Sequence, residues 1–408
     1  MSEVALKILQ VSPAYYPAIC IGGPIFSTLA LSKSLVASGH ALTTLTTPLG
    51  LNQQDTAEVE LGRSVQITRG HAIVYQPYSG YAHFTWSPPT LRWLRQHAKE
   101  FDLLILHGVW NFPLLAAAWI CQRQSIPYVL YPHGTLYRDT VTLRSGLKKR
   151  IMLALFVRRM LRRAARVVFT TSDEAQKVQA FLGLKLSASI VPNIVDHSEF
   201  ESLPTRGSLR RELGIPADSS VLLHLGRIAT KKGLNTTLDV LARLRVAGRK
   251  VSLLIVGGDE GGLQAQLELQ AQRLGIEAHV YFTGLLGRQQ TLQALVDSDV
   301  FILPSLSENF GMAVVEAMLA SVPVVISDHV GLAPDVASAA AGVVVPLSGG
   351  AAAFTDAVGK LLDMDEYRRE LGAAGRYFAI ANYSNSAVSG RVESLLKDAV
   401  MEARHALR

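Results

Sequence analysis

Short apolar runs rich in β-branched residues alternate with helical patterns along this chain, and the alternation occurs twice. In the first half, stretches such as PIFSTLALSKSLVAS and the basic segment after Thr142 lie between the runs. The runs read LKILQVS, LTTLTT, LLILHG, YVLYPHG, VVFTTS and ASIVPN. Strands that are apolar along their whole length are typical of parallel sheets covered by helices on both faces. The pattern predicts an α/β fold with a doubly wound parallel sheet.

The second half repeats the alternation and predicts a second sheet of the same kind. Its apolar runs are SVLLHLGR, VSLLIVGG, HVYFTG, VFILPS, VPVVIS and GVVVP. A polar stretch that contains Pro and Gly, Asp196–Ser220, separates the two sets of runs. The 408 residues are enough for two domains with separate cores. We predict Rossmann-like domains over residues 1–200 and 201–382.

Composition narrows the class of protein. Hydrophobic residues make up 49% of the chain and charged residues 18%, which excludes a disordered protein. The two cysteines, Cys20 and Cys121, have no metal-ligand spacing and favour a reducing compartment. The N-terminal stretch MSEVALKILQVSP lacks the features of a signal peptide, and no run reaches the ~18 apolar residues of a membrane span. We therefore expect a cytoplasmic protein.

Two cations follow the first strand of the second half. Parallel sheets bind ligands outside the carboxyl ends of their strands, so polar residues there are candidates for function. Arg227 ends the run SVLLHLGR, and Lys232 lies just before Gly233 and the next helical pattern. Cations beside a helix N-terminus suit a diphosphate. For this stretch alone, solvated surface cations remain the commoner interpretation.

Two carboxylates flank a Phe-Gly turn in the stretch SENFGMAVVEAM, which follows the run VFILPS. Glu308 is expected in the loop, and Glu316 one turn into a helix that begins near Met312. Carboxylates suit the vicinal hydroxyls of a sugar or a ribose, and the backbone amides of the turn suit sugar or phosphate oxygens. The alternative, in which Glu308 caps the helix and Glu316 lies on its solvated face, fits this stretch equally well.

The first half offers two weaker candidates at the same kind of edge. Gly22 and Gly23 lie between the first strand and the first helix, where glycine lets the backbone approach a phosphate or a sugar. His133 ends the run YVLYPHG and could donate to a sugar hydroxyl or a leaving oxygen. A plain flexible loop and a structural histidine are the more common outcomes for such residues taken singly.

One pattern that suggests a metal is set aside. Asp297 and Asp299 form a D-x-D pair, but they precede the run VFILPS and therefore lie at the amino end of a strand. We interpret them as residues of a helix end and a turn. Since no His/Cys cluster is present either, we expect no metal site.

Taken together, these motifs resemble the retaining glycosyltransferases of family 4. The resemblance is carried by the Gly-Gly loop, His-Gly at 133–134, the GR…KKG pattern that begins at Gly226, and E-N-F-G-x4-E that begins at Glu308. The stretches TSDEAQ, VPNIVD and VGG fit as well, and the matching motifs span nearly the whole chain in order. The resemblance implies the GT-B fold, in which two facing Rossmann-like domains border a cleft. It also implies that residues 383–408 form a helix that crosses back to the N-terminal domain.

The resemblance implies a role for each candidate. Arg227 and Lys232 would grip the donor diphosphate, Glu316 would bind the nucleotide ribose, and Glu308 would lie beside the transferred sugar. His133 would be the active-site histidine. Other residues would bind the donor, in part through their backbone: Gly22, Gly23, Gly257, Leu285, Asn309, Phe310, Gly311 and Met312.

The implied reaction is transfer from a nucleotide-diphosphate sugar, with retention at the anomeric carbon and without a metal or other cofactor. The acceptor would be a glycan or a lipid-linked acceptor in surface polysaccharide or glycolipid biosynthesis. The sequence departs from the family pattern at two places: Val109-Trp110 follows LLILHG, where many members carry a second His, and Ile194 stands where Gly is frequent. The first departure lies on the acceptor side and bears on the identity of the acceptor. A sugar-nucleotide epimerase of the same fold and a non-catalytic nucleotide-sugar-binding subunit remain as alternatives.

The net charge of +7 is concentrated between Arg138 and Arg166. On a helix, the cations Arg158, Arg159, Arg162, Arg163 and Arg166 share one arc, and the apolar residues Leu153, Val157, Met160, Leu161 and Ala164 share the opposite one. An anionic membrane surface is one candidate partner, through Arg158, Arg159, Arg162 and Arg163. A domain helix with its polar face in water fits equally well. No recognition motif for nucleic acid accompanies the charge, so we expect no such partner.

Overall fold

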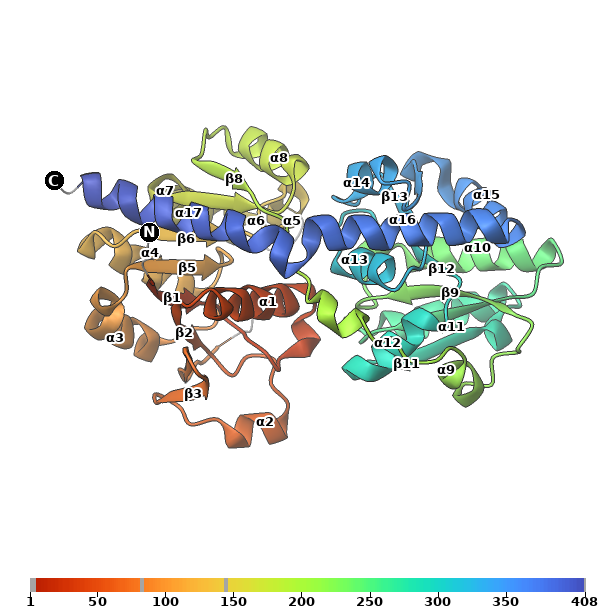
Figure 1. Ribbon diagram of the computed structural model, residues 1–408, viewed down its shortest axis with the longest axis horizontal. Helices are drawn as coiled ribbons and strands as arrows, with labels where there is room; N and C mark the ends of the chain where they lie inside the picture. Colours follow the sequence, from red (N-terminus) through yellow and green to blue (C-terminus); the bar gives the residue numbers. More distant parts are fainter. Residues whose placement is uncertain (1–4, 81–83, 143–145, 407–408) are drawn as a thin grey trace. The chain divides into compact units, whose positions relative to one another are not determined.

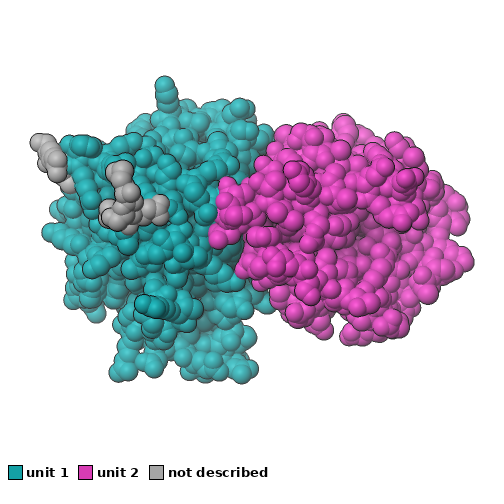
Figure 2. All heavy atoms as spheres, in the orientation of Figure 1, with its two compact units in different colours: residues 1–194, 388–408 teal, residues 195–387 magenta. Residues whose placement is uncertain are grey.

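The computed structural model describes residues 5–80, 84–142 and 146–406. The chain divides into two compact units, which Figure 2 shows in different colours. Unit 1 comprises residues 1–194 and 388–408, and unit 2 comprises residues 195–387. The sequence placed the boundaries after residues 200 and 382.

Within its described residues, unit 1 contains an eight-stranded sheet in the order β3-β4-β2-β1-β5-β6-β7-β8 (Figure 1). All neighbouring strands are parallel except β3 and β4, which pair antiparallel. The strands are β1 (Lys7–Val11), β2 (Ala41–Thr46), β3 (Ser64–Thr68), β4 (His71–Tyr75), β5 (Leu103–His107), β6 (Tyr128–Tyr131), β7 (Arg166–Phe169) and β8 (Ala188–Ile190). The six strands expected here are confirmed, and β3 and β4 were missed.

Unit 2, all of whose residues are described, contains a parallel six-stranded sheet in the order β11-β10-β9-β12-β13-β14. The strands are β9 (Ser220–Leu225), β10 (Val251–Val256), β11 (Val280–Gly284), β12 (Val300–Leu303), β13 (Val324–Ser327) and β14 (Gly342–Val345). Each corresponds to one of the apolar runs expected in this half. The predicted α/β class with two parallel-sheet domains is therefore confirmed.

Both faces of the unit 2 sheet are covered, because successive residues of one strand enter two different cores. Leu223 of β9 packs in a core with α12, α13 and α14, whereas its neighbour Leu222 packs in a core with α10, α11 and α15. The helical segments of unit 2 are η4 (His197–Phe200), α9 (Ser208–Glu212), η5 (Thr230–Lys232), α10 (Leu234–Val246), α11 (Leu263–Arg273), η6 (Glu277–His279), α12 (Arg288–Val296), α13 (Met312–Leu319), α14 (Ala333–Ser338), η7 (Leu347–Gly349), α15 (Gly350–Asp363) and α16 (Asp365–Tyr383).

In unit 1, α3, α4, α7 and α8 pack on one face of the sheet. The described helical segments are η1 (Ile19–Ile21), α1 (Gly23–Ala37), α2 (Gln53–Glu58), α3 (Pro88–His97), η2 (Ala98–Glu100), α4 (Phe112–Gln124), α5 (Arg138–Thr142), α6 (Gly146–Met152), η3 (Leu153–Val157), α7 (Arg158–Arg163), α8 (Ser172–Leu182) and α17 (Asn385–Ala406). Ile8 and Ile105 face the opposite side from Leu9 and Leu104 and are equally buried, so this sheet is covered on both faces as well.

Helix α17 belongs to unit 1 from Val388 onward. Its apolar side chains recur every three or four residues and are buried, as in an amphipathic helix that packs on a core. Polar contacts fix its register: Arg391 donates to the Ile190 carbonyl at 2.8 Å, and Arg404 bonds Asp102 at 2.9 Å.

The basic segment differs from the helix that the sequence predicted. It consists of α6, a π-helical turn at η3 and α7, which ends at Arg163. Arg166 therefore does not share the helical arc; it begins β7 and forms an ion pair with Glu402. The predicted apolar arc is confirmed, because Leu153, Val157, Met160, Leu161 and Ala164 are all buried.

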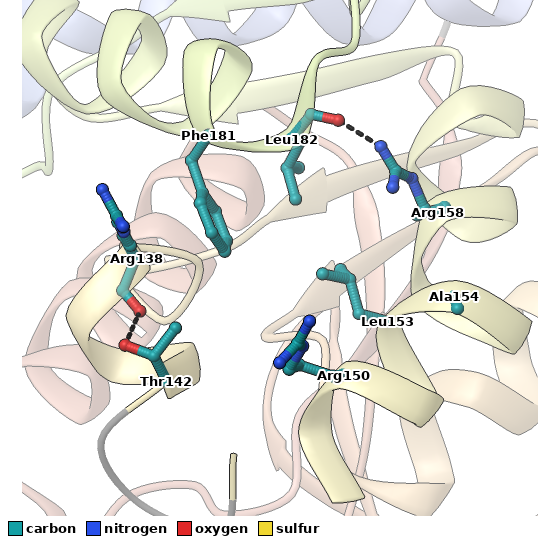
Figure 3. A pocket seen from close by; sticks show the side chains of 8 residues that line it. All are labelled: Arg138, Thr142, Arg150, Leu153, Ala154, Arg158, Phe181 and Leu182. Atoms are coloured by element: carbon teal, nitrogen blue, oxygen red, sulfur yellow. Dashed lines mark hydrogen bonds between the residues drawn. The ribbon is translucent and has the colours of Figure 1, made fainter. Parts of the chain in front are cut away.

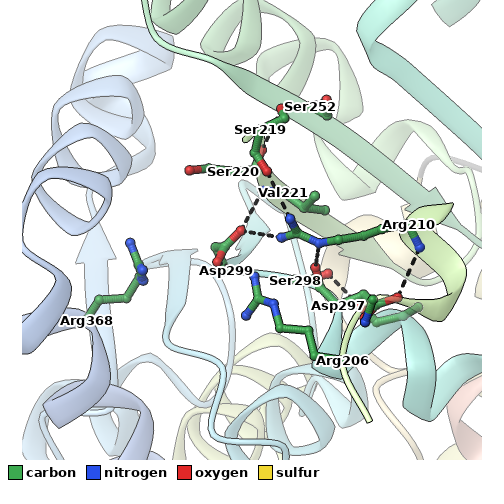
Figure 4. Close-up of polar contacts among 12 residues, drawn as sticks. Arg206, Arg210, Ser219, Ser220, Val221, Ser252, Asp297, Ser298, Asp299 and Arg368 are labelled. Carbon is green, nitrogen blue, oxygen red and sulfur yellow. Dashed lines mark hydrogen bonds and ion pairs between the residues drawn. The ribbon is translucent and has the colours of Figure 1, made fainter. Parts of the chain in front are cut away.

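The D-x-D pair belongs to the framework of unit 2, as expected (Figure 4). Asp297 follows the last turn of α12 and accepts from the amides of Leu209 and Arg210 at 2.9 and 3.1 Å. Asp299 accepts from the Val221 amide at 2.8 Å and pairs with Arg206 and Arg210. Burial opposes ionisation of Asp299, but the amide and the two guanidinium groups outweigh it and lower the pKa. Both carboxylates thus join α9 to the amino ends of β9 and β12.

Candidate functional site

The candidate residues of unit 2 all follow the carboxyl ends of parallel strands. Arg227 and Lys232 follow β9, Gly257 follows β10, and Leu285 follows β11. The loop that contains Glu308 follows β12. The loops after β9 and β12 are tied together, because the Leu306 amide and the Ser305 hydroxyl both donate to the Lys231 carbonyl, at 2.7 and 2.8 Å. The topology therefore brings residues distant in sequence to one edge of this sheet.

Lys232 and Glu308 form a direct ion pair in this edge. Their side chains are 12% and 16% exposed, so Lys232 is not a solvated surface cation. Burial opposes ionisation of Glu308, but the ammonium groups of Lys232 and Lys231 outweigh it and lower the pKa of the carboxyl. Glu308 does not cap the helix, since Gly311 occupies the N-cap position of α13 and no side chain caps it. The Glu308 carboxylate is therefore ionised at neutral pH.

Arg227 is the more accessible cation of this edge. Its guanidinium is 36% exposed and donates to Glu260 at 3.0 Å. An exposed ion pair of this kind is weak and exchanges readily for another anion. Arg227 is thus placed to release Glu260 and bind a phosphate.

Glu316 is held by an arginine that the sequence reasoning missed. Arg288, the first residue of α12, donates to Glu316 at 2.5 Å and to Glu199 at 2.6 Å. Its guanidinium lies 5.1 Å from the ring centroid of Phe200, in cation–π contact. Glu316 is only 15% exposed, so the alternative of a solvated helix face is wrong. The position of Arg288 after β11 could have revealed it, by the same edge rule that found Leu285.

Gly257 has a packing role that sequence alone did not reveal. A Cβ atom at this position would lie 1.9 Å from the Gly226 carbonyl oxygen, and φ is +149°. Two backbone hydrogen bonds produce this close approach. The Gly226 amide donates to the Val256 carbonyl and the Gly257 amide to the Gly284 carbonyl, both at 2.9 Å. Glycine is therefore required here to let the ends of β9, β10 and β11 converge.

In the turn after Glu308, backbone groups rather than side chains are available to contact a ligand. Phe310 is buried and packs edge-on against Tyr383, with ring centroids 5.4 Å apart. Gly311 adopts φ +92° at the start of α13, while Asn309 and Met312 on either side are half-buried. Leu285 is 52% exposed. This surface suits the hydroxyls and the flat ring of a nucleotide sugar.

In unit 1, His133 pairs with a second histidine that the sequence reasoning missed. Nδ1 of His107 lies 2.9 Å from Nε2 of His133, and the rings stack with centroids 5.2 Å apart. Burial lowers the pKa of His133 to about 4; burial and the neighbouring ring lower the pKa of His107 well below 6.5. Both rings are neutral at neutral pH. His107 could have been predicted from the sequence, because it ends β5, the strand next to β6, which His133 follows.

The loop that carries His133 is fixed by a fully buried carboxylate. Glu174 of α8 accepts from the Gly134 amide at 2.8 Å and from the Thr170 amide and hydroxyl at 3.0 and 3.1 Å. His133 itself has φ +51°, an unusual backbone conformation for a non-glycine residue. Glu174 thus stabilises a constrained loop, and it lies in the TSDEAQ stretch that sequence analysis noted.

Gly22 is the N-cap residue of α1, which begins at Gly23 directly after η1. Gly22 adopts φ +93° and accepts from the Ile25 amide at 3.0 Å. This places the backbone of the loop at the carboxyl edge of β1, as expected.

Two searches of the described residues gave negative findings. Across residues 5–80, 84–142 and 146–406, no three His, Cys, Asp or Glu side chains cluster as metal ligands would. None of the helices in those ranges has the length and hydropathy that a membrane crossing requires.

Comparison with known protein families matches both halves of the chain. Residues 21–199 match the model of Glycosyltransferase Family 4, and residues 205–378 match that of Glycosyl transferases group 1. Phosphatidyl-myo-inositol mannosyltransferase of Mycobacterium leprae is 30% identical over 335 residues, which cover 80% of this chain and 82% of that protein. Alpha-monoglucosyldiacylglycerol synthase of Streptococcus pneumoniae is 26% identical over 326 residues, 78% of this chain and 70% of that protein.

Solved structures agree on the fold. Sucrose-phosphate synthase from Thermosynechococcus elongatus superposes with a TM-score of 0.77 at 20% identity, covering 96% of this chain and 98% of that one. Anabaena HepE in complex with UDP-glucose superposes with a TM-score of 0.75 at 20% identity, covering 96% and 99%. Two α/β units with these matches define a glycosyltransferase of the GT-B fold. The chain belongs to glycosyltransferase family 4, as its motifs indicated.

Proposed function

We propose that this protein transfers a sugar from a nucleotide-diphosphate sugar to a glycan or lipid-linked acceptor, with retention at the anomeric carbon. The acceptor product would enter surface polysaccharide or glycolipid biosynthesis. The observation that carries the proposal is the convergence of Arg227, Lys232, Glu308 and Glu316 on one sheet edge of unit 2. Two cations and two acids fit the diphosphate, the sugar and the ribose of one ligand.

In this proposal, Lys232 and Arg227 bind the donor diphosphate. Glu308 holds the Lys232 ammonium in place, and its carboxylate would lie beside the transferred sugar. As the bond from the anomeric carbon to the phosphate oxygen breaks, negative charge develops on the diphosphate, and the two cations stabilise it. The acceptor hydroxyl attacks from the same face and passes its proton to the leaving phosphate. Catalysis then rests on positioning and charge stabilisation and needs no enzyme nucleophile or metal.

Glu316 binds the ribose in this proposal, and Arg288 orients it. The Arg288 guanidinium donates a hydrogen bond to Oε1 of Glu316. The other carboxylate oxygen has no partner among the described residues and is available to a ribose hydroxyl. The Glu199 carboxylate and the Phe200 ring hold the guanidinium in turn.

Replacing Arg288 by Met is expected to raise the KM for the donor by roughly tenfold with little change in kcat, because one charge-assisted hydrogen bond that orients Glu316 is lost. Arg288→Lys should recover part of the loss through the retained charge. Steady-state kinetics of donor cleavage measure both parameters. Arg243→Met, on the exposed face of α10, is the matched control. A donor KM equal to that of the control would refute the role of Arg288.

On the acceptor side, His133 is proposed to contact the sugar or the acceptor as a neutral ring, beside the Gly22–Gly23 backbone. Its second ring nitrogen, Nδ1, has no partner among the described residues. We further propose peripheral association with an anionic membrane through Arg158, Arg159, Arg162 and Arg163. Arg159 is oriented by Gln122 at 2.8 Å, and Arg162 and Arg163 are exposed.

The stereochemical proposal is tested by proton NMR of slow donor cleavage in the presence of a chelator. We expect the first sugar released to have the anomeric configuration of the donor, before mutarotation, and the rate to be unaffected by the chelator. A first product of inverted configuration would overturn retention. A rate that is lost with the chelator and restored by a divalent cation would overturn metal independence.

A further inference from the structure

The basic segment of unit 1 exposes apolar side chains that its sequence pattern did not predict. Leu147 is 74% exposed, Ile151 50%, Leu155 63% and Phe156 54%. The first three recur at intervals of four residues, which places them along one side of α6 and η3. We call these four residues the apolar ridge. Clustered exposed apolar side chains of this size mark an interaction surface rather than ordinary surface.

A pocket of about 430 Å³ is lined in part by residues of α6 and η3, the two segments that carry most of the ridge (Figure 3). Three arginines, Arg138, Arg150 and Arg158, are among its lining residues, and its apolar lining includes Leu153, Phe181 and Leu182. In Figure 3 the Arg138 guanidinium points away from the hollow. No carboxylate is among the described residues that line it. Arg158 is held at the rim by a hydrogen bond to the Leu182 carbonyl, and neither Arg138 nor Arg150 pairs with a described carboxylate. The pocket therefore combines positively charged residues with apolar walls, which favours an amphipathic anion.

The π-helical turn η3 contributes residues to both the pocket and the ridge. Leu153 and Ala154 line the pocket, while the next two residues, Leu155 and Phe156, belong to the ridge. Turns of this kind are rare and occur frequently at functional sites. A ligand seated in the pocket would therefore have its anionic group among the guanidiniums and any apolar extension along the ridge.

We propose that the pocket binds the phosphate of an anionic phospholipid while the apolar ridge inserts among the acyl chains. Asp139 is the single acid between positions 138 and 163 of the sequence, so the electrostatic field here attracts anions. A soluble phosphate would leave the ridge in water, whereas a lipid uses both features. Apolar side chains flanked by cations are the composition of an interfacial membrane anchor. This site deepens the proposed membrane association and rests on it.

The test is cosedimentation of the full chain with vesicles of phosphatidylcholine alone or with added phosphatidylglycerol. We expect binding only to the anionic vesicles. Leu155→Gln/Phe156→Gln should weaken binding more than tenfold, since two large apolar side chains lose their burial. Arg150→Gln should weaken it about fivefold. All three substituted side chains are exposed, and the matched controls Leu269→Gln and Arg243→Gln in unit 2 should bind like the wild type.

Several outcomes would overturn the proposal. One is the absence of binding to anionic vesicles. Another is an equal loss of vesicle binding in Leu269→Gln and Arg243→Gln, which would show that binding does not depend on the pocket and the ridge. Displacement of vesicles by inorganic phosphate at constant ionic strength would point to a soluble ligand instead. Tighter binding to duplex DNA with the same dependence on Arg150 would point to nucleic acid. Thermal stabilisation by nucleotide sugars tests donor binding to unit 2. Absence of that stabilisation would contradict the donor proposal but not the proposed lipid site of unit 1.

Discussion

Replacing Lys232 by Ala is expected to lower the rate of donor cleavage by a factor of about 10³, the cost of removing one preorganised group that stabilises developing charge. The Lys232 ammonium lies at the carboxyl edge of the unit 2 sheet, where it pairs with Glu308. Its side chain is less exposed than that of Arg227, the other cation proposed to bind the diphosphate. Release of the nucleotide diphosphate from the donor, followed over time, measures the rate.

The single variant also leaves Glu308 without its partner, which costs stability, about 3 kcal/mol for a buried pair. Lys232→Met/Glu308→Leu removes both charges and separates the two effects: it should fold well and remain inactive. Lys250→Ala is the matched control, because Lys250 pairs with the exposed Asp218 where β10 begins, at the opposite edge of the sheet. Cleavage within tenfold of wild type by the double variant would refute the role of this pair.

Acidification from pH 7 to 5 is expected to lower the unfolding midpoint strongly. Burial lowers the pKa of His71 and His133 to about 4 and, together with the Lys232 ammonium, lowers that of His224 to about 3. The pKa of His107 is lowered as well. The unfolded chain binds protons near pH 6.5 and the folded chain does not, so stability is complete above about 6.5 and is lost as the pH falls toward 4.

Each of these histidines contributes about 1.4 kcal/mol per pH unit within that window, so together they remove several kcal/mol by pH 5. Thermal unfolding at a series of pH values, at constant ionic strength, measures the effect. His224→Leu should flatten the dependence by one histidine's share, since its fully buried ring becomes an apolar side chain of similar size. A midpoint that stays constant between pH 7 and 5 would contradict neutral, buried histidines.

The sheet of unit 2 was predictable in full because every one of its strands is a continuous apolar run bounded by polar turns. The two strands missed in unit 1 differ in this respect. β3 is exposed along its whole length and pairs antiparallel at the sheet edge, so it lacks that signal. β4 carries an apolar run over residues 72–75 and pairs parallel with β2, so its signal was present and was overlooked. The break of the basic segment into α6, η3 and α7 was equally invisible, because α and π turns use the same residue types.

At the site, the edge rule located residues, but their partners required the fold. The pairs Lys232–Glu308 and Arg288–Glu316 join residues 76 and 28 positions apart, a separation that no local pattern reports. Glu174 was missed for the same reason, whereas His107 ends β5, where the edge rule could have located it. The exposed side of the basic segment was misjudged in part, because helical periodicity identifies the buried arc and says nothing about which remaining apolar residues face water.

The central claim is that the edge of unit 2 bearing Lys232 and Glu316 binds a nucleotide-diphosphate sugar. The most direct test is a screen of nucleotide sugars by thermal unfolding of the wild type, Lys232→Met/Glu308→Leu, Glu316→Gln and Lys250→Ala. We expect at least one nucleotide sugar to raise the unfolding midpoint of wild type and Lys250→Ala by roughly 5 °C at saturating concentration, and the shift to disappear largely in the other two variants. A shift of equal size in all four proteins, or none in the wild type with any nucleotide sugar, would contradict it.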